Sequence, residues 1–310
     1  MSEDQPGPGA ETPEATRCGF IAVIGAPNAG KSTLVNTLVG TKVAIVSRKV
    51  QTTRTTLRGI AIEGRSQLVF IDTPGIFAPR RRLDRAMVAA AWGGAGDADL
   101  VLLVVDAAKG HDEDVERIVD RLKDSKASLL LALNKIDRVR KEHLLALAAD
   151  LNARLPFAAT FMISALDGNG VADLKAHLAR SMPLGPWHYP EDEVTDAPLR
   201  VLAAEITREK IYDRLHDELP YEAAVETTQW KEQGKGLHIE QTIYVERDSQ
   251  KRIVVGKGAA MIKQLSMEAR KELSEILERK VHLFLFVKVR EGWGDDPARY
   301  RDLGLAFPKE

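Results

Sequence analysis

The sequence predicts an α/β protein with a mostly parallel sheet, followed by a smaller α+β unit. Short apolar runs alternate with stretches of helical period between residues 17 and 181. Near-continuous apolar strands separated by helices are typical of a parallel sheet that is covered on both faces. Beyond residue 198 the order changes to one helix, two alternating strands, further helices and a last strand. Two such patterns within 310 residues indicate two folding units.

Hydrophobic periodicity places the individual elements. In the first unit we expect strands at residues 19–24, 67–71, 100–106, 129–133 and 158–163. Helices are expected there at residues 31–38, 112–123, 141–154 and 171–181. In the second unit we expect a helix at 199–215, strands at 223–230, 238–246 and 282–289, and helices before the last strand.

Composition divides the chain into four parts. Residues 1–16 are rich in Pro, Gly and Glu and hold almost no large apolar side chains, so we expect a disordered tail. Residues 182–197 contain three prolines and four acidic residues without an apolar helical stripe, which is typical of an exposed linker. The expected units are therefore residues 17–181 and 198–310.

The overall charge identifies no partner, and the cysteine count excludes two kinds of site. The net charge is −1, and a near-neutral sum can still hide a basic face. Cys18 is the only cysteine of the sequence, which excludes an internal disulfide and a cysteine-based metal cluster. No secretion signal opens the sequence, and the apolar runs are too short to span a membrane, so we expect a cytoplasmic protein.

A phosphate-binding turn is predicted where the first apolar run meets the first helix. The sequence there reads GAPNAGKS, which fits the pattern GxxxxGK[ST] in the strand-to-helix context that this motif needs. Backbone N–H groups of such a turn surround phosphate oxygens, Lys31 neutralises the β and γ phosphates, and the Ser32 hydroxyl serves Mg²⁺. The predicted nucleotide-binding residues here are Gly25, Ala26, Pro27, Asn28, Ala29, Gly30, Lys31, Ser32 and Thr33.

A second phosphate motif, Asp72-Thr73-Pro74-Gly75, follows the next predicted strand. Asp72 can reach the shell of the magnesium ion, and the Gly75 backbone N–H can donate to the γ-phosphate. The carboxyl ends of parallel strands meet at one edge of a sheet, so the two motifs are expected to converge. All four residues of this motif are predicted to bind nucleotide.

Two further motifs favour guanine over adenine. Asn134-Lys135-Ile136-Asp137 follows the strand at 129–133, and its aspartate can accept from N1–H and from the exocyclic amine of guanine. Backbone N–H groups of Ser164-Ala165-Leu166 are placed to donate to the guanine O6. The predicted guanine-site residues are Asn134, Lys135, Asp137, Ser164, Ala165 and Leu166. This order of motifs resembles the translation-factor-related, Ras-like GTPases.

The resemblance also assigns the first switch, between the phosphate turn and the second motif. A threonine there closes over Mg²⁺ when the γ-phosphate is present; we assign Thr53, with Thr52 as the alternative. Lys31, Thr53, Asp72 and Gly75 are the predicted catalytic residues, and Ser32 and Thr53 the predicted Mg²⁺ ligands. Ile76 stands where Ras-type enzymes carry the glutamine that orients water, so hydrolysis must be arranged differently. We interpret the switch-region arginines as solvated charges or partner contacts, with an arginine finger as the alternative: Arg48, Arg54, Arg80, Arg81 and Arg82.

A basic glycine turn marks the second unit as a candidate RNA-binding module. Residues 253–263 place an apolar strand-like run, a turn and a helix in series, which resembles the KH module and its GxxG loop. The predicted RNA-binding residues are Gly256, Lys257, Gly258, Ala259 and Lys263. The fourth loop position is Ala259 instead of glycine, which adds a methyl group where the backbone approaches RNA.

The whole chain closely resembles the Era family. The resemblance rests on GxPNAGKS, SRKxQTTR, DTPGI, NKID and SAL, followed by the linker and by VKVREGW with Asp295-Asp296. It implies a type II KH fold, binding to the 3′ end of small-subunit ribosomal RNA, a role in small-subunit maturation and loose peripheral contact with the membrane. It also implies GTP and GDP as ligands, Mg²⁺ as cofactor and a monomer. Asn28 matches the position that related potassium-activated GTPases use to hold a cation, which gives the hypothesis that K⁺ activates the enzyme.

Two other function classes stay open at this point. One is a constitutive RNA-binding protein or chaperone whose nucleotide site is structural and turns over slowly. The other is an ATP-dependent kinase, which the intact NKID motif disfavours.

Overall fold

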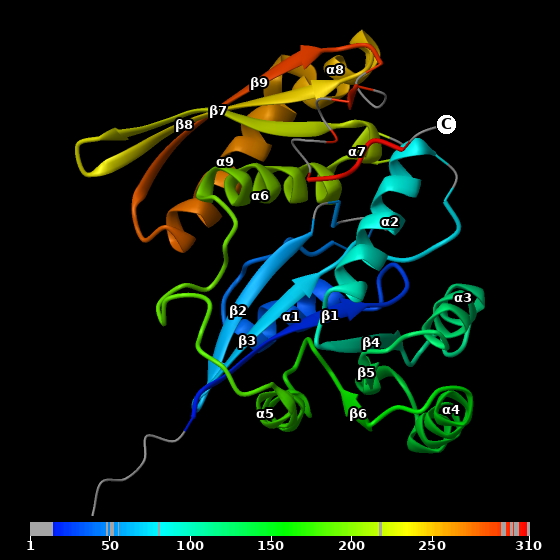
Figure 1. Ribbon diagram of the computed structural model, residues 1–310. Coiled ribbons are helices and arrows are strands. Elements are labelled where there is room, and N and C mark those ends of the chain that lie inside the picture. The colour runs from blue at the N-terminus through cyan, green and yellow to red at the C-terminus, as the bar shows by residue number, and fades with distance from the viewer. Residues whose placement is uncertain are drawn as a thin grey trace, which may run out of the picture.

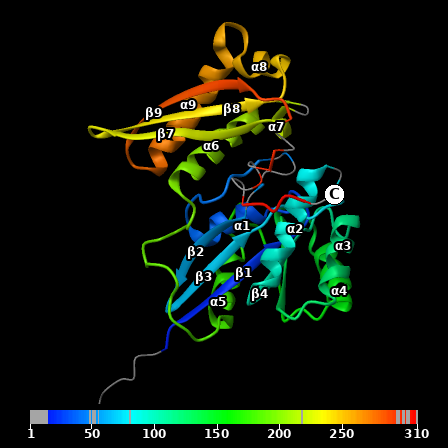
Figure 2. The same ribbon diagram turned by 45° about the horizontal axis from the view of Figure 1, so that its top comes forward.

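The computed structural model describes residues 15–47, 49, 53–54, 56–79, 81–216, 219–292, 296–297, 300 and 304–308. Within these residues the chain forms two units, each built around its own sheet (Figure 1). The N-terminal unit holds a sheet of six strands and the C-terminal unit a sheet of three. Helix α6 (Leu199–Arg214) lies on the side of its sheet that faces the N-terminal unit (Figures 1 and 2).

The six-stranded sheet has the order β2-β3-β1-β4-β5-β6, and its neighbours are parallel except for β2 and β3. The strands are β1 (Arg17–Ile24), β2 (Leu57–Glu63), β3 (Ser66–Asp72), β4 (Leu100–Asp106), β5 (Ser128–Asn134) and β6 (Ala159–Ile163). Every residue of β3 and β4 is buried. Continuous burial explains why these strands are apolar along their length rather than alternating.

Helices cover both faces of this sheet. On one face lie α1 (Lys31–Val39) and α5 (Val171–Ser181), and their apolar side chains form one core cluster with those of the strands. On the other face lie α2 (Arg82–Gly96), α3 (Glu113–Leu122) and α4 (Lys141–Arg154), with a second cluster. A layered arrangement of this kind leaves the strand ends, and the loops that follow them, free to build a site.

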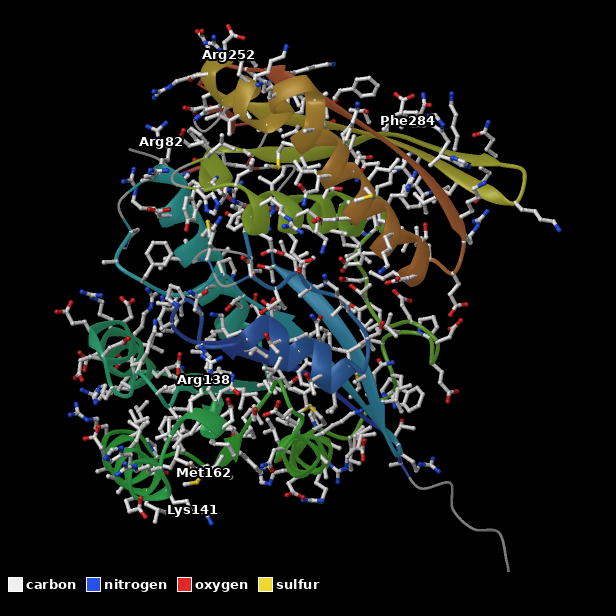
Figure 3. All side chains as sticks on the ribbon, turned by 180° about the vertical axis from the view of Figure 1, so that it is seen from behind. Arg82, Arg138, Lys141, Met162, Arg252 and Phe284 are labelled. Atoms are coloured by element: carbon white, nitrogen blue, oxygen red, sulfur yellow. The ribbon has the colours of Figure 1, made fainter. Side chains whose placement is uncertain are left out.

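The C-terminal unit has helices on one face of a mixed sheet. Its further elements are α7 (Leu219–Glu222), β7 (Ala224–Gln233), β8 (Gly236–Val245), α8 (Asp248–Val255), α9 (Ala260–Ile276) and β9 (Lys280–Val289). The central strand β8 is antiparallel to β7 and parallel to β9. Helices α6, α8 and α9 bury their apolar residues against this sheet. Phe284, which is labelled in Figure 3, lies outside that core and is 48% exposed. Phe286, two positions further along the same strand, is also 48% exposed.

The predicted α/β class and the predicted order of the second unit are confirmed. Each predicted strand and helix of the first unit is present, with ends that differ by a few residues at most. Strand β2 and helix α2 were not predicted. The prediction of a strand-like run at residues 253–255 was wrong, because these residues form the last turn of α8. Short apolar runs fit a strand and a buried helix turn equally well.

The segment at 182–197 joins the two units and is held along part of its length. Ile60 of β2 donates its backbone N–H to Val194 (2.8 Å), and Gly59 forms a β-bridge with Thr195. The buried Gln67 accepts from the backbone N–H groups of His188 and Tyr189 (2.9 and 3.0 Å). Of the predicted tail, residues 1–14 lie outside the described residues.

The chain returns to the N-terminal unit after β9. Tyr300 and Leu305 are buried against Ala86 and Met87 of α2, and Phe307 packs at the border of this cluster. The contact links the far end of the chain to the helix that follows the DTPG motif. In the described part of the chain, every helix is too short or too polar to cross a bilayer.

Candidate functional site

The phosphate turn connects β1 to α1, as the motif requires. Lys31 begins α1 and is only 6% exposed. Its ammonium group donates to the carbonyl oxygens of Gly25 and Ala26, each at 3.0 Å, so the side chain lies over its own turn. Burial lowers the pKa of Lys31 to about 8, and the nearby charge of Asp72 partly opposes this shift. The turn therefore presents a positive charge among backbone groups.

Three oxygen-bearing side chains meet beside this lysine. Ser32 Oγ donates to Asp72 Oδ2 (2.7 Å) and lies 2.9 Å from Thr53 Oγ1, which in turn lies 3.4 Å from Asp72 Oδ2. Burial raises the pKa of Asp72 to about 6, while the hydrogen bond from Ser32 and the charge of Lys31 lower it. The second oxygen, Asp72 Oδ1, is buried and accepts no hydrogen bond from the described residues.

This donor set suits a hard divalent cation. Two hydroxyls and a carboxylate provide only oxygen atoms, which are the ligands that Mg²⁺ prefers. A buried carboxylate oxygen without a partner is costly, and a cation or its bound water would satisfy it. Ser32 and Thr53, the two predicted metal ligands, thus lie together at a place where such an ion fits. The alternative, Thr52, falls outside the described residues.

The DTPG motif lies directly against the phosphate turn. Thr73 Oγ1 donates to the backbone of Val23 in β1 (2.9 Å), and the Ile76 N–H donates to the Gly25 carbonyl (3.1 Å). A Cβ atom on Gly75 would lie 2.9 Å from Pro27 Cα, so only glycine fits this close approach without a shift. Pro74 is buried beside it. The two predicted phosphate motifs are therefore brought together.

The NKID motif ties the phosphate turn to the loop after β6. Asn134 donates to the Ala29 carbonyl (2.8 Å) and accepts from the Ala165 N–H (2.9 Å). Lys135 reaches the Asn28 carbonyl and the carboxylate of Asp106, each at 2.6 Å. Asp106 ends β4 and was not predicted, although its place at a strand end beside the other motifs is a signal that could have identified it.

Asp137 and the loop at 164–166 lie at the far end of the same edge. Asp137 is exposed, and its Oδ1 accepts from Ser164 Oγ (2.9 Å). Its other oxygen lies 3.6 Å from Nε of Arg138, which is labelled in Figure 3. Leu166 is 76% exposed. An exposed carboxylate such as that of Asp137 can accept hydrogen bonds from a ligand.

The predicted site residues thus gather along one edge of the six-stranded sheet. Asp72 lies beside Lys31, and Asn134 links the turn that holds Lys31 to the loop that touches Asp137. Thr33, in the first turn of α1, is half-buried. Of the switch-region arginines, Arg48 and Arg80 lie outside the described residues, and Arg54 points into the C-terminal unit.

The basic glycine turn lies between α8 and α9. Gly256 follows α8, and a Cβ atom there would lie 2.8 Å from the Met261 nitrogen. Residues 257–259 form a single 3₁₀ turn, in which Gly258 and Ala259 both have left-handed backbone angles (φ 59° and 61°). Lys257 and Lys263 are exposed. The expectation that alanine at 259 adds only a methyl group was incomplete, because this position has the backbone geometry that favours glycine.

Family models match both units. One described as "50S ribosome-binding GTPase" matches residues 20–135, and one described as "KH domain" matches residues 218–294. GTPase Era of Bradyrhizobium sp. (strain BTAi1 / ATCC BAA-1182) is 62% identical over 310 residues, which is 100% of this chain and 99% of that protein. GTPase Era of Rhizobium meliloti (strain 1021) is 62% identical over 295 residues, 95% of this chain and 94% of that protein.

Solved structures match both units in one arrangement. A crystal structure of Era in complex with MgGDPNP and nucleotides 1506–1542 of 16S ribosomal RNA has a TM-score of 0.89 and 36% identity, over 94% of this chain and 99% of that one. An Aquifex aeolicus Era variant bound to GDP·AlF₄⁻ gives the same TM-score and identity, over 94% and 100%. These matches confirm the predicted fold class, a P-loop GTPase unit followed by a KH unit.

Proposed function

This chain belongs to the Era family of GTPases, and on that basis we propose that it uses GTP hydrolysis to time the binding and release of ribosomal RNA. It hydrolyses GTP to GDP and phosphate. The RNA is the 3′ end of small-subunit ribosomal RNA, and the process is assembly of the small ribosomal subunit. The observation that carries the proposal is the meeting of Ser32, Thr53 and Asp72 beside Lys31, at one edge of the sheet.

The phosphates of GTP lie in the turn from Gly25 to Thr33. Lys31 gives up its two carbonyl contacts for the β and γ phosphates, which are far stronger acceptors because they are charged. The Gly75 N–H, held against Pro27, donates to the γ-phosphate. Thr53 closes the site from the first switch. These residues stabilise the negative charge that develops on the transferred phosphoryl group in the transition state, which is how a protein accelerates this reaction.

Mg²⁺ is the cofactor that the site accommodates. Ser32 and Thr53 would hold it directly through their hydroxyls, and Asp72 would orient its water shell with the oxygen that has no partner among the described residues. When bound, the ion neutralises charge between the β and γ phosphates. Ile76 is buried and offers no hydrogen bond to water, so we expect a slow intrinsic rate, on the order of 10⁻⁴ to 10⁻² per second.

Guanine selection is the role of the far end of the edge. Asp137 accepts from the N1–H and the amine of guanine, and the loop at 164–166 donates a backbone N–H to the O6. The N–H groups of Ser164 and Ala165 donate to Asn169 and Asn134, so Leu166 is the donor that this loop offers to the base. Lys135 and Asn134 hold the loops that carry these groups. ATP is a poor fit, because adenine has no donor at N1.

RNA binding is assigned to the turn at 256–259 and to Lys263. Backbone N–H groups and the exposed Lys257 and Lys263 approach the phosphates of a single strand. By the family resemblance we extend the proposal to a cytoplasmic monomer with loose peripheral contact at the membrane. The units that act are residues 17–181 and 198–310.

The test compares phosphate release from GTP with and without RNA of the small-subunit 3′ end. We expect a slow basal rate that RNA or the small subunit changes, and a loss of about 100-fold in Lys31→Ala. Lys123→Ala is the matched control, because Lys123 is exposed and forms an i,i+3 pair with Asp120 of α3. A rate that RNA leaves unchanged, together with RNA affinity that ignores the nucleotide, would favour a constitutive RNA-binding protein.

Potassium activation is part of the same proposal. Asn28 lies in the phosphate turn with a left-handed backbone (φ 62°), and its carbonyl accepts from Lys135. We expect faster turnover in KCl than in NaCl at equal ionic strength, and Asn28→Ala should remove the difference. Equal rates in the two salts in the parent protein would contradict the role of Asn28.

A further inference from the structure

Thr53 and Arg54 are consecutive in the chain, yet their side chains enter different units. Thr53 Oγ1 lies 2.9 Å from Ser32 Oγ, within the candidate nucleotide site. The Arg54 side chain enters the C-terminal unit, where the residue is only 3% exposed. A peptide unit thus joins a group at the γ-phosphate site to a group buried in the RNA-binding unit.

The guanidinium of Arg54 is held by neutral oxygens around α7. Nη1 donates to the Ala223 carbonyl (2.8 Å), and Nη2 donates to the carbonyls of Pro220 and Tyr221 (3.1 and 2.7 Å). Nη2 also lies 3.1 Å from the Tyr212 hydroxyl of α6. The last carbonyls of a helix have no partner within it, so the arginine satisfies groups that would otherwise stay unpaired.

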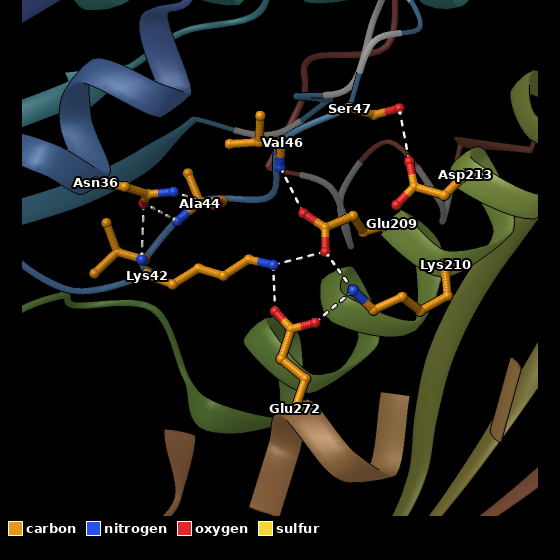
Figure 4. Close-up of polar contacts among 10 residues, drawn as sticks. Asn36, Lys42, Ala44, Val46, Ser47, Glu209, Lys210, Asp213 and Glu272 are labelled. Atoms are coloured by element: carbon orange, nitrogen blue, oxygen red, sulfur yellow. Dashed lines mark hydrogen bonds and ion pairs between the residues drawn. The ribbon is translucent and has the colours of Figure 1, made fainter. Parts of the chain in front are cut away.

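The segment that leads to Thr53 is fastened to α6 as well. The Val46 N–H donates to Glu209 Oε1 (2.7 Å), and Lys42 pairs with Glu209 Oε2 (2.6 Å) and with Glu272 of α9 (Figure 4). Ser47 lies 3.2 Å from Asp213 (Figure 4). In these contacts Lys42 and Val46 are partly exposed, whereas Glu209 is as buried as Arg54, each at 3% exposure. Burial makes the Arg54 contacts costly to break, because each carbonyl would lose its donor away from water.

We propose that Arg54 is a positioning residue that couples the place of Thr53 in the first switch to the RNA affinity of the C-terminal unit. This inference rests on the proposed function, in which RNA affinity depends on the bound nucleotide. Thr53 cannot leave its place beside Ser32 without moving α7 or withdrawing Arg54 from it. The two ends of α7 lead to α6 and to β7, so a shift of α7 reaches the sheet on which α8 and α9, the helices that flank the basic glycine turn, are packed. RNA bound to that unit biases Thr53 through the same contacts.

Arginine is the residue that this place requires. Its planar fork offers five N–H donors. The four acceptors described above lie in α6, in α7 and just after α7. Lysine would keep the charge but could not reach Ala223 and the α7 carbonyls together. The role of Arg54 is therefore in geometry as well as charge.

The experiment measures the affinity of a labelled RNA, nucleotides 1506–1542 of 16S ribosomal RNA, in the presence of Mg²⁺ with GDP or with a non-hydrolysable GTP analogue. In the parent protein we expect at least about a 5-fold ratio between the two affinities, as is typical of coupled sites. In Arg54→Ala and Arg54→Lys the ratio should fall below about 2-fold, while GDP affinity stays within about 3-fold. Tyr212→Phe removes one of the four acceptors of Arg54, together with a contact to Arg208, and should lower the ratio in part. It guards against an Arg54 variant that fails to fold.

Arg58→Ala is the matched control. Arg58 lies in β2, four positions further along, and pairs with Asp196 of the linker instead of with α7. Arg58→Ala should keep the ratio between the RNA affinities in the two nucleotide states that the parent protein shows. If Arg54→Lys and Tyr212→Phe are folded and also keep it, the role of Arg54 is overturned while the proposed function stands. If the parent protein itself shows a ratio of one, the proposed function fails, and this inference fails with it.

Discussion

Lys31 and Asp72 lie side by side where burial works against the charge of both. Burial moves the pKa of the lysine down to about 8 and that of the aspartate up to about 6. At neutral pH both groups are still charged, because 7 lies between the two values. The molecule thus keeps two buried, opposite charges ready for magnesium triphosphate at the expense of its own stability in the absence of ligand.

Asp72→Asn is expected to stabilise the protein without nucleotide or metal. The raised pKa of Asp72 means that its contribution to stability is full below pH 3.8 and is lost as pH rises through about 6. At pH 8 the variant should be more stable by about 1–3 kcal/mol, and the gain should shrink at pH 4.5. Urea unfolding in EDTA at the two pH values measures this. A gain that is the same at both would show that ionisation is not its cause.

Asp137→Asn should change the base that the enzyme selects. The amide would donate where the carboxylate accepts, which suits the C2 oxygen of xanthine and opposes the amine of guanine. We expect GTP affinity to fall by about 100-fold or more and XTP affinity to rise, as titration with both nucleotides would show. Asp167→Asn is the control, because Asp167 also accepts from Ser164 Oγ but is not part of NKID. Unchanged preference for GTP would remove Asp137 from the guanine site.

Sequence reasoning reached the site residues that belong to motifs and missed those defined by a distant partner. Lys31, Asp72 and Asp137 each follow a predicted strand, so the rule that parallel strands end at one edge was enough to bring them together. Arg54 could only be grouped with other switch arginines, because its acceptors lie 158 or more residues away in the chain. Asp106 also ends a predicted strand at this edge but belongs to no motif, so its position alone pointed to it before the contact with Lys135 was seen.

Among the elements, the same contrast holds for strands and helices. The buried parallel strands were predictable because burial on both faces makes them uniformly apolar. Strand β2 begins just after the first switch and contains Gly59, so its alternation is short and broken. Helix α2 carries three glycines in its last four positions, a composition that opposes a helix prediction. Packing of Ala91 and Ala95 on the sheet outweighs that low propensity.

In the turn between α8 and α9, substitutions at two positions should change the free energy of unfolding in opposite directions. Ala259 holds a left-handed backbone, which costs an alanine about 1 kcal/mol, so Ala259→Gly should raise the free energy of unfolding by up to that amount. Gly256→Ala should lower it by about 1–3 kcal/mol, because the backbone there (φ 74°, ψ 167°) is one that only glycine adopts readily and the new methyl would meet the Met261 nitrogen. Urea unfolding of both variants checks this. If both substitutions shift stability in the same direction, backbone strain does not govern this turn.

At the scale of the whole molecule, Gln67 holds the linker to the N-terminal unit. Its side chain is fully buried, and it accepts from two linker N–H groups and donates to the Tyr189 carbonyl (2.8 Å). Gln67→Ala leaves these groups without their partner, so we expect a loss of about 1–3 kcal/mol and faster proteolysis near residues 188–189. Thr195→Ala removes an exposed hydrogen bond to Arg58 and should change little. Equal cleavage rates in both variants would show that the linker is held by other contacts.

The pairing of the linker with β2 has a consequence for the protein in a crowded solution. β2 is the outermost strand of its sheet, and Val194 and Thr195 take up hydrogen bonds along its outer side. An unpaired strand edge is a template on which another chain can add a strand. Because residues 194–195 occupy this edge, they prevent a second chain from pairing with β2. A protein nicked in this segment should therefore form oligomers through β2 before its two units unfold.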